Sequence, residues 1–238
     1  MISVEEAKRL MMECMQPMPN VVDDPRGCYG FRLAQDVAAP FDHPLFDMSA
    51  VDGYAFAHGA GHAGWKVVSN IAAGEACHDV LHPGECVRIF TGAMLPMGAD
   101  TVVMQEQVQR TGDVVTHSDD GLRAGSNVRV RGEQVRAGDL LLKAGTHLGP
   151  AAIGLLTSVG VRKVSVYDRP MVRVLRTGGE FVDGSIIPPG RIFSSNDVML
   201  RSALFEDAIH AEPDTVKDDR RALTKALSQA SSFDAFIT

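Results

Sequence analysis

The stretch PLFDMSAVDGYAFA, Pro44–Ala57, places two carboxylates, Asp47 and Asp52, inside a run of apolar and small residues. Asp52 and Gly53 form a pair typical of turns, because glycine accepts a positive φ and aspartate tolerates it. The apolar residues Tyr54–Phe56 predict a strand that leaves this turn. A carboxylate held there could project into a cleft from a rigid strand, or it could bond its own backbone as a turn cap. The stretch alone leaves both interpretations open.

The composition is that of an ordinary globular protein, with 238 residues, 45% hydrophobic and 22% charged. The net charge of -7 argues against a nucleic-acid or anionic-membrane surface, but not against an anionic small molecule. No apolar run approaches the roughly 20 residues that span a bilayer, and the N-terminus lacks a signal-peptide pattern. Four scattered cysteines without a C-x-x-C pair fit a reducing compartment. These features predict a cytoplasmic protein.

The N-terminal segment predicts a helix that starts with a capping box formed by Ser3 and Glu6. Apolar residues at helical spacing predict one buried stripe: Ala7, Leu10, Met11, Cys14 and Met15. Pro17 ends this helix, and the residues up to Gly27 are predicted as loop. Tyr29–Pro40 is predicted as a short extended segment.

Strand-sized runs separated by turns predict a small β-rich module between about Gly64 and Arg131. The runs are Trp65–Val68, Cys86–Phe90, Thr101–Met104, Val114–Thr116 and Asn127–Arg131. Two histidine pairs lie here at a spacing of four residues, His58 with His62 and His78 with His82. That spacing aligns two imidazoles only on a helix, which the flanking glycines and Pro83 disfavour. We therefore expect loop histidines and no zinc site.

A second informative block is Arg88–Glu106, RIFTGAMLPMGADTVVMQE. Thr91 lies in it at a turn that contains Gly92. The hydroxyl and the backbone amide of such a threonine can both donate to one anionic oxygen, but they can equally stabilise the turn. The pattern makes Thr91 a candidate for anion binding, with a structural alternative.

The remaining sequence changes to an α/β pattern. A helix is predicted from Gly149-Pro150, with Ala152, Leu155, Leu156 and Val159 buried, and a strand follows at Val161–Val166. Beyond Pro170, the predicted order is strand, helix, helix, strand, at Met171–Arg176, after Asn196, after Asp218 or Asp219, and at Phe233–Thr238. The helices are predicted to bury Met199, Leu200, Ala203 and Leu204 in one, and Leu223, Leu227 and Ala230 in the other.

This order implies a parallel sheet, whose ligands bind beyond the carboxyl ends of the strands. The segment Thr177–Glu180, TGGE, lies at such an end. Glu180 is therefore a candidate site residue, with a solvated loop carboxylate as the alternative.

Three blocks together resemble one known family. SAVDGYA at Ser49–Ala55 resembles the S-A-M-D-G-(Y/F)-A signature of molybdopterin molybdotransferases, the MoeA and gephyrin E-domain family. Arg88–Glu106 is similar to that family's R-I-M-T-G-A-x-x-P-x-G-A-D-x-V-V-x-x-E, and Val128–Val166 follows its pattern almost throughout. Two positions depart from it: Gln134 stands where the family reads G-E-D, and Gly179 where it reads T-G-D-E-L.

The resemblance implies an α/β and β multidomain fold in three parts. Residues 1–40 and 140–168 are expected to form a split, elongated helical/β domain for linkage and dimerisation. Residues 41–139 are expected to form the inserted, small β-rich domain. Residues 169–238 are expected to be a partial, truncated parallel α/β domain that binds molybdopterin, because FDAFIT resembles the strand before the family's S-G-G-V-S phosphate loop. The chain is thus expected to cover the first half to two-thirds of a family member.

The resemblance also implies a reaction, the insertion of molybdate into adenylylated molybdopterin with release of AMP. It implies catalytic roles for Asp52, Thr91, Glu180 and Asp218. It implies cofactor binding by Ser49, Gly92, Thr177, Gly178 and Asp219, and ligation of Mg²⁺ by Asp52 and Glu180. The expected active form is a homodimer in which Asp52 and Thr91 come from one subunit, and Glu180 and Asp218 or Asp219 from the other. The protein is also expected to contact the molybdopterin adenylyltransferase.

Two alternatives remain. The departures at Gln134 and Gly179 favour a non-catalytic scaffold or metabolite-binding protein built on the same fold. The other alternative is a fragment of an intact enzyme that is inactive by itself, because it lacks the phosphate loop.

Overall fold

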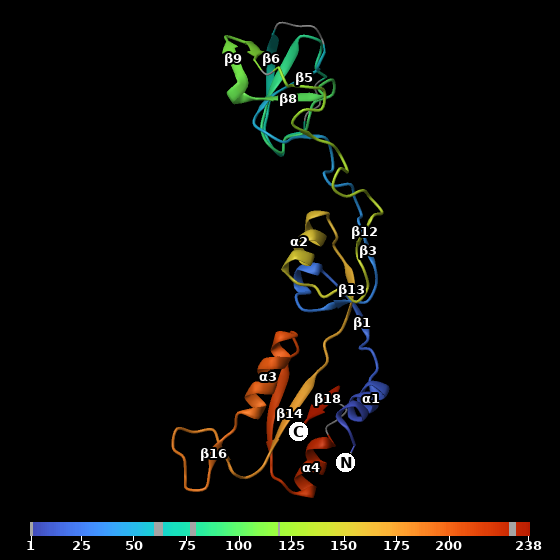
Figure 1. The fold of residues 1–238 in the computed structure, drawn as a ribbon, viewed down its shortest axis with the longest axis vertical. Helices are drawn as coiled ribbons and strands as arrows, with labels where there is room; N and C mark the ends of the chain where they lie inside the picture. The colour runs from blue at the N-terminus through green and yellow to red at the C-terminus, as the bar shows by residue number, and fades with distance from the viewer. Residues whose placement is uncertain (1, 60–63, 77–79, 119, 229–231) are drawn as a thin grey trace. The chain divides into compact units, whose positions relative to one another are not determined.

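The structure is a computed structural model, and it describes residues 2–59, 64–76, 80–118, 120–228 and 232–238. Contacts divide the chain into two compact units (Figure 1). One unit is Ala38–Leu140, and the other joins Met1–Val37 to Leu141–Thr238. The predicted further boundary between residues 168 and 169 is not tested by this division and stays a prediction. No helix in the described ranges is long and apolar enough to cross a membrane.

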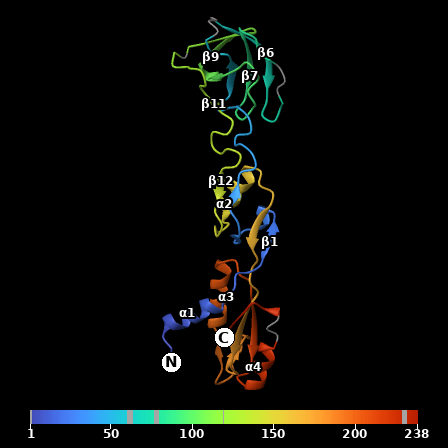
Figure 2. The ribbon, with the colours of Figure 1, turned by 90° about the vertical axis from the view of Figure 1, so that its right-hand side faces the viewer.

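The unit Ala38–Leu140 is built on a six-stranded sheet of order β8-β5-β7-β6-β10-β9. Its strands are β5 (Gly53–Phe56), β6 (Trp65–Ile71), β7 (Glu85–Ile89), β8 (Thr101–Met104), β9 (Val108–Thr111) and β10 (Val114–His117). The β-rich character that the sequence predicted is confirmed, although β9 was missed. A smaller pair joins β4 (Met48–Ser49) to β11 (Val128–Arg129). Figure 2 shows β6 and β7 side by side.

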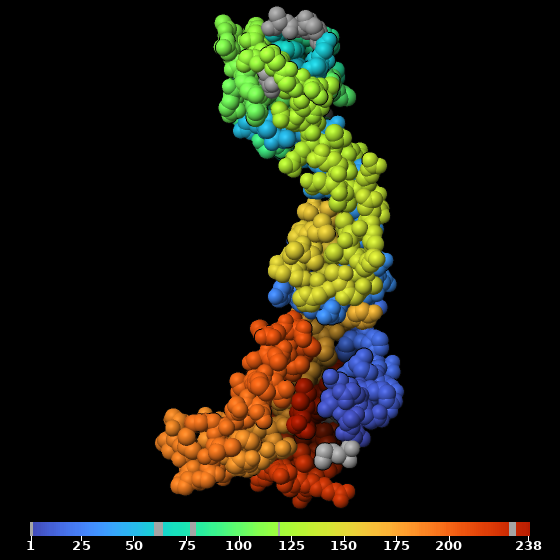
Figure 3. Space-filling view, viewed as in Figure 1, coloured from blue at the N-terminus to red at the C-terminus, as the bar shows by residue number. Residues whose placement is uncertain are grey.

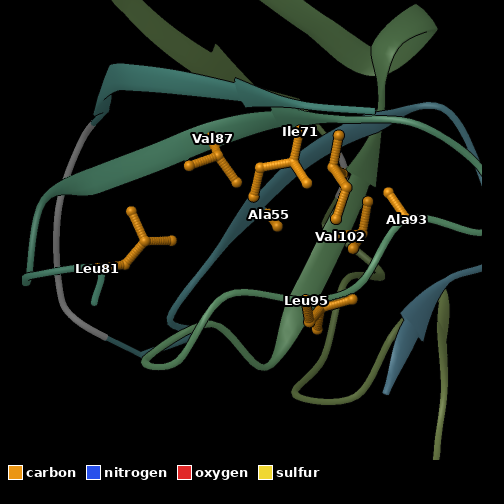
Figure 4. Close-up of a cluster of buried hydrophobic side chains, with 8 residues drawn as sticks. Ala55, Ile71, Leu81, Val87, Ala93, Leu95 and Val102 are labelled. Carbon is orange, nitrogen blue, oxygen red and sulfur yellow. The ribbon is translucent and has the colours of Figure 1, made fainter. Parts of the chain in front are cut away.

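Both faces of the sheet are covered around β5, where all four residues are buried, and this explains why the strand carries small and apolar side chains on both faces. One core cluster contains Ala55, Ile71, Leu81, Val87, Ile89, Ala93, Leu95 and Val102 (Figure 4). The other contains Tyr54, Phe56, Trp65, Cys86, Val103, Val115 and Leu122. Neighbouring residues of a strand, such as Tyr54 and Ala55, belong to different clusters because side chains alternate across a sheet.

Gly53 is required in β5 for a reason that the sequence did not reveal. Its φ is not in the left-handed region, so the predicted positive φ is wrong. A Cβ atom at Gly53 would lie 1.9 Å from the carbonyl oxygen of Val103 in β8, which pairs antiparallel with β5. Gly53 therefore permits a close backbone approach.

The N-terminal helix α1 (Val4–Cys14) starts where the sequence predicted, with the Glu6 amide donating to Ser3 Oγ at 3.1 Å. The predicted buried stripe is wrong, because no residue of α1 is buried. Met11 is 54% exposed and Met15 is 63% exposed. The space-filling view accordingly shows α1 at the surface (Figure 3). Helical spacing reveals an apolar stripe, but not what covers it.

The segment predicted as loop before residue 28 contains a strand, β1 (Asn20–Asp23), and the 3-10 turn Pro25–Gly27. β1 and β2 (Arg32–Leu33) lie on either side of β13 (Val164–Tyr167), and both pair with it in antiparallel fashion. The loop prediction is wrong because these short strands are stabilised by a partner far along the chain. Two further short strands, β3 (Val37–Ala38) and β12 (Leu140–Leu142), pair with each other. The predicted helix after Gly149 is confirmed as α2 (Pro150–Ser158).

The C-terminal part is a three-stranded parallel sheet of order β17-β14-β18. Two helices, α3 and α4, accompany this sheet (Figure 1). Its elements are β14 (Val172–Thr177), α3 (Asn196–Glu206), β17 (Ala211–Val216), α4 (Arg220–Leu227) and β18 (Ala235–Ile237). The predicted parallel sheet is confirmed, but β17 was missed because Pro213 interrupts its sequence. Proline is tolerated there because β17 is an edge strand. The helices cover opposite faces of β14, with α3 over Val172 and Val174 and α4 over Leu175.

Details of the helices differ from the prediction. Asp219 caps α4 by accepting from the Ala222 amide, but Ser195, not Asn196, precedes α3, and no side chain caps it. Met199 and Leu227, predicted to be buried, are 62% and 46% exposed. Ala230 lies outside the described residues. Strands β15 (Phe181–Val182) and β16 (Ile192–Phe193), which were not predicted, form a separate parallel pair.

A pair of glycine variants tests the close approach of β5 and β8. Gly53→Ala should lower the free energy of unfolding by about 3 kcal/mol, because the added methyl meets backbone that cannot rotate away. Gly154→Ala should raise it by roughly 0.5–1 kcal/mol, because Gly154 is helical and a Cβ there meets nothing within 4 Å. Urea unfolding followed by circular dichroism and Trp65 fluorescence measures both. Equal stabilities of the two variants would contradict the role assigned to Gly53.

Candidate functional site

The antiparallel pairing of β5 with β7 brings Asp52 and Thr91 together. Gly53, at the start of β5, is opposite Ile89, at the end of β7. Asp52 lies just before β5 and Thr91 just after β7, so both are at the same end of the strand pair. The backbone amide of Thr91 donates to Asp52 Oδ1 at 2.8 Å, and the Thr91 hydroxyl donates to the same oxygen at 2.7 Å. Two residues that lie 39 positions apart in the chain therefore form one unit of the candidate site.

These bonds keep Asp52 ionised. The Thr91 amide contributes most, followed by the Thr91 hydroxyl and the positive charge of Arg88, and together they hold the pKa of Asp52 below its usual range. Within the described residues, both hydrogen bonds recorded for the carboxylate end on Oδ1. The second oxygen, Oδ2, is the one that can contact a ligand.

The donors expected to bind an anion are engaged within the protein. Thr91 uses its amide and hydroxyl on Asp52, and the Gly92 amide donates to the Ser49 carbonyl at 2.9 Å. Ser49 is 1% exposed, and its hydroxyl donates to the Val51 carbonyl at 2.6 Å. An anion would have to displace these bonds to be held by Thr91 or Gly92. In this structure the group supports the turn and orients the Asp52 carboxylate.

The other predicted site residues lie in the second unit. Thr177 ends β14, and Gly178 follows with a φ of 134°. A Cβ atom at Gly178 would lie 2.3 Å from Glu180 Oε2, so the Glu180 carboxylate folds over this glycine. Asp219 is occupied as the cap of α4, and Asp218 next to it is exposed. The structure therefore gathers Ser49, Asp52, Thr91 and Gly92 in one unit, and Thr177, Gly178, Glu180, Asp218 and Asp219 in the other.

A pocket of about 390 Å³ lies where the parallel sheet predicts one. It is lined by the carboxyl end of β14, the first turn of α3 and the end of β18, including Thr177, Asn196 and Thr238. The chain leaves β14 to β17 on one side and later returns to β18 on the other, which is where ligands bind in such sheets.

Arg176 lines this pocket and was not among the predicted site residues. Its guanidinium donates to both oxygens of Asp183 at 2.8 Å and to Thr215 Oγ1 at 2.9 Å, and the bond to Asp183 raises its pKa. The signal that could have revealed Arg176 is a charged residue within the apolar strand run VRVLRT.

The acidic residues do not form a metal site by themselves. No group of three or more His, Cys, Asp or Glu residues gathers in the part of the chain that the structure describes. Asp52 and Glu180, the expected ligands, belong to separate units. His62 and His78, of the two histidine pairs, lie outside the described residues. The donor set of either unit alone does not fit Mg²⁺, which needs several oxygen ligands in octahedral geometry.

Comparisons with known proteins identify the family. Residues 2–160 match the MoeA N-terminal region (domain I and II), and the chain belongs to this family. A molybdopterin molybdenumtransferase from Staphylococcus aureus is 34% identical over 209 residues, covering 84% of this chain and 50% of the relative. One from Staphylococcus epidermidis is 30% identical, covering 96% of this chain and 57% of the relative. The chain thus spans about half the length of the curated relatives it matches.

Solved structures agree with this assignment. A molybdopterin biosynthesis MoeA protein from Pyrococcus horikosii superposes with a TM-score of 0.78 at 31% identity, over 99% of this chain and 62% of that one. A second structure, from Pyrococcus horikoshii OT3, gives a TM-score of 0.82 at 27% identity, over 99% of this chain and 65% of that one. The resemblance found in the motifs and the predicted mixed α/β and β multidomain fold are both confirmed.

The hydrogen bonds to Asp52 make a prediction about its titration. Thr91→Val removes the hydroxyl donor and keeps the backbone amide. The pKa of Asp52 should therefore rise and still remain below about 3.9, the pKa of a free aspartate. Thr91→Ser keeps both donors and should leave the midpoint unchanged. Carboxyl-carbon NMR titration measures this directly. A midpoint that is the same in the Val and Ser variants would show that the hydroxyl contributes nothing.

The lowered pKa of Asp52 also makes the stability of the fold depend on pH. Because the folded-state pKa is lowered, the stabilisation from Asp52 is fully present above the unfolded-state value of about 3.9. It is lost as the pH falls through the folded-state value.

Proposed function

We propose that the protein acts in molybdenum cofactor biosynthesis, in the insertion of molybdate into adenylylated molybdopterin with release of AMP. Support comes from its membership of the MoeA N-terminal family and from relatives named molybdopterin molybdenumtransferase. The observation that carries the proposal is the Asp52 carboxylate, fixed through Oδ1 by both donors of Thr91. An oriented, ionised carboxylate of this kind is suited to holding a cation.

The charge of the substrates indicates what Asp52 does. Molybdate and a pyrophosphate linkage are anions, and a carboxylate repels them unless a cation lies between. We propose that Asp52 Oδ2 of one subunit and Glu180 of the partner subunit supply oxygen ligands for Mg²⁺. That ion, when bound, would neutralise the leaving phosphate. Thr91 keeps the Asp52 carboxylate oriented while the remaining ligands assemble.

The homodimer is part of the same proposal. Asp52 and Glu180 lie in different units, and the apolar residues of α1 are exposed and need a partner. The pocket at the end of β14 is lined by Thr177 and by Arg176, whose guanidinium is engaged by Asp183 and Thr215. The cytoplasmic location and the contact with a molybdopterin adenylyltransferase remain proposals as well.

A non-catalytic scaffold or metabolite-binding protein is the alternative. The observation that favours it is Gly179, because the chain lacks the acid that the family motif places between Gly178 and Glu180.

The two proposals predict different results for Asp52 variants. The test protein is a fusion of residues 1–238 to the C-terminal half of the Staphylococcus aureus relative that the chain does not match. Asp52→Asn keeps an acceptor for Thr91 but removes the charge, so the fold should be kept and molybdenum transfer should fall at least about 100-fold. Asp52→Glu is the matched control, which keeps the charge and moves it by one methylene.

Transfer from adenylylated molybdopterin, with AMP release, is the measurement. Normal turnover by the Asn variant would assign Asp52 to the turn alone. An inactive parent fusion that still binds molybdopterin would favour the non-catalytic alternative.

A further inference from the structure

Arg88 lies beside the Asp52–Thr91 pair and has no role in the function proposed above. It belongs to β7 and is half-buried. Its guanidinium lies over two aromatic rings, 5.2 Å from the centre of Tyr54 and 4.8 Å from that of Phe90. These stacking contacts fix the plane of the guanidinium group.

The two terminal nitrogens of Arg88 reach two different segments. Nη1 donates to the carbonyl oxygen of Gly53 at 2.7 Å, directly after Asp52 in the chain. Nη2 donates to Oε1 of Gln105, which follows the end of β8. The backbone amide of Gln105 in turn donates to the carbonyl oxygen of Asp52 at 3.0 Å. Arg88 thus connects the ends of β5, β7 and β8 around one residue.

We propose that Arg88 is the positioning residue of the Asp52–Thr91 pair, and this inference rests on the function proposed above. Its fork holds the backbone at Asp52 and at the next residue, directly through the Gly53 carbonyl and indirectly through Gln105, whose backbone amide donates to the Asp52 carbonyl. The carboxylate then projects from an anchored peptide toward Thr91. Arg88 acts through these neighbours, because both terminal nitrogens are engaged by them.

An arginine is required for this arrangement. Its planar fork serves two acceptors in fixed directions and stacks on aromatic rings at the same time. A lysine ammonium keeps the charge, but it lacks a flat head group that stacks on the rings. It also lacks a planar fork that can donate to the Gly53 carbonyl oxygen and the side-chain oxygen of Gln105 at the same time. The nearby charges are Asp52 and Glu106, whose Oε1 accepts from Gln105 Nε2 at 3.0 Å.

The experiment measures amide hydrogen exchange by NMR on the whole 238-residue chain. The reporters are two backbone amides. That of Thr91 donates to the Asp52 side chain, and that of Gln105 donates to the Asp52 backbone carbonyl. Arg88→Lys and Arg88→Gln should both raise exchange at these amides by about tenfold or more, while the amides of β5 keep their protection. Arg110→Lys is the matched control, since Arg110 also donates to a carbonyl, that of Gly112 at 2.9 Å, in the same unit.

Two results would overturn the proposal. One is unchanged exchange at Thr91 and Gln105 in both Arg88 variants. The other is a uniform loss of protection over β5, β7 and β8, which would make Arg88 a general stabiliser of the sheet. Because exchange needs no substrate, this outcome is independent of whether the protein transfers molybdenum. In the fusion protein, Arg88→Lys should lower kcat by about tenfold or more and leave KM within about twofold.

Discussion

The hydrogen bonds from Thr91 to Asp52 Oδ1 are the interaction on which the candidate site depends. They join the segment before β5 to the segment after β7, and one carboxylate oxygen accepts both donors. A carboxylate with one oxygen fixed in this way presents the other in a defined direction. The same bonds lower the pKa of Asp52, so its carboxylate is charged at neutral pH. Orientation and ionisation therefore have one cause.

The backbones beside that pair also approach closely. Gly53 allows the carbonyl of Val103 to come where a side chain would stand, and this places β8 against β5. The end of β8 then brings Gln105 to the Asp52 carbonyl, and Arg88 connects both segments. The motif residues are thus explained by sheet geometry before any ligand is considered. A role of Asp52 and Thr91 in the turn is compatible with the proposed role of Asp52, because the same contacts orient its carboxylate.

Much of this could be predicted from the sequence where the signal is local or carried by a family motif. The helix start at Ser3, the strand after Asp52 and the helix after Gly149 all follow from caps and turn residues, and the structure confirms them. The resemblance, now confirmed, selected Asp52 and Thr91, but it could not show that Thr91 donates to Asp52. That contact depends on strand register over a long sequence separation.

The remaining errors share a physical origin. The strand β17 was missed because Pro213 is a poor strand residue except at an edge, and the position of an edge is a tertiary property. The stripe of α1 was predicted as buried because periodicity does not reveal a covering partner. Gly53 was predicted as a turn residue with a positive φ, but it starts β5 and permits a close backbone approach, since its neighbour across the sheet is not visible in the sequence.

The two units hold their candidate carboxylates in different ways, and Gly179, which replaces the acid of the family motif, lies beside only one of them, Glu180. In the unit Ala38–Leu140, the backbone amide and the hydroxyl of Thr91 both donate to Asp52, and both residues belong to that unit. At the end of β14, Glu180 lies over Gly178, and only the small hydrogen of that glycine permits this position. Gly179 leaves the segment Thr177–Glu180 without the acid of the family motif, so Glu180 supplies its one charge. That carboxylate lies against Gly178, where a Cβ atom would meet it at 2.3 Å.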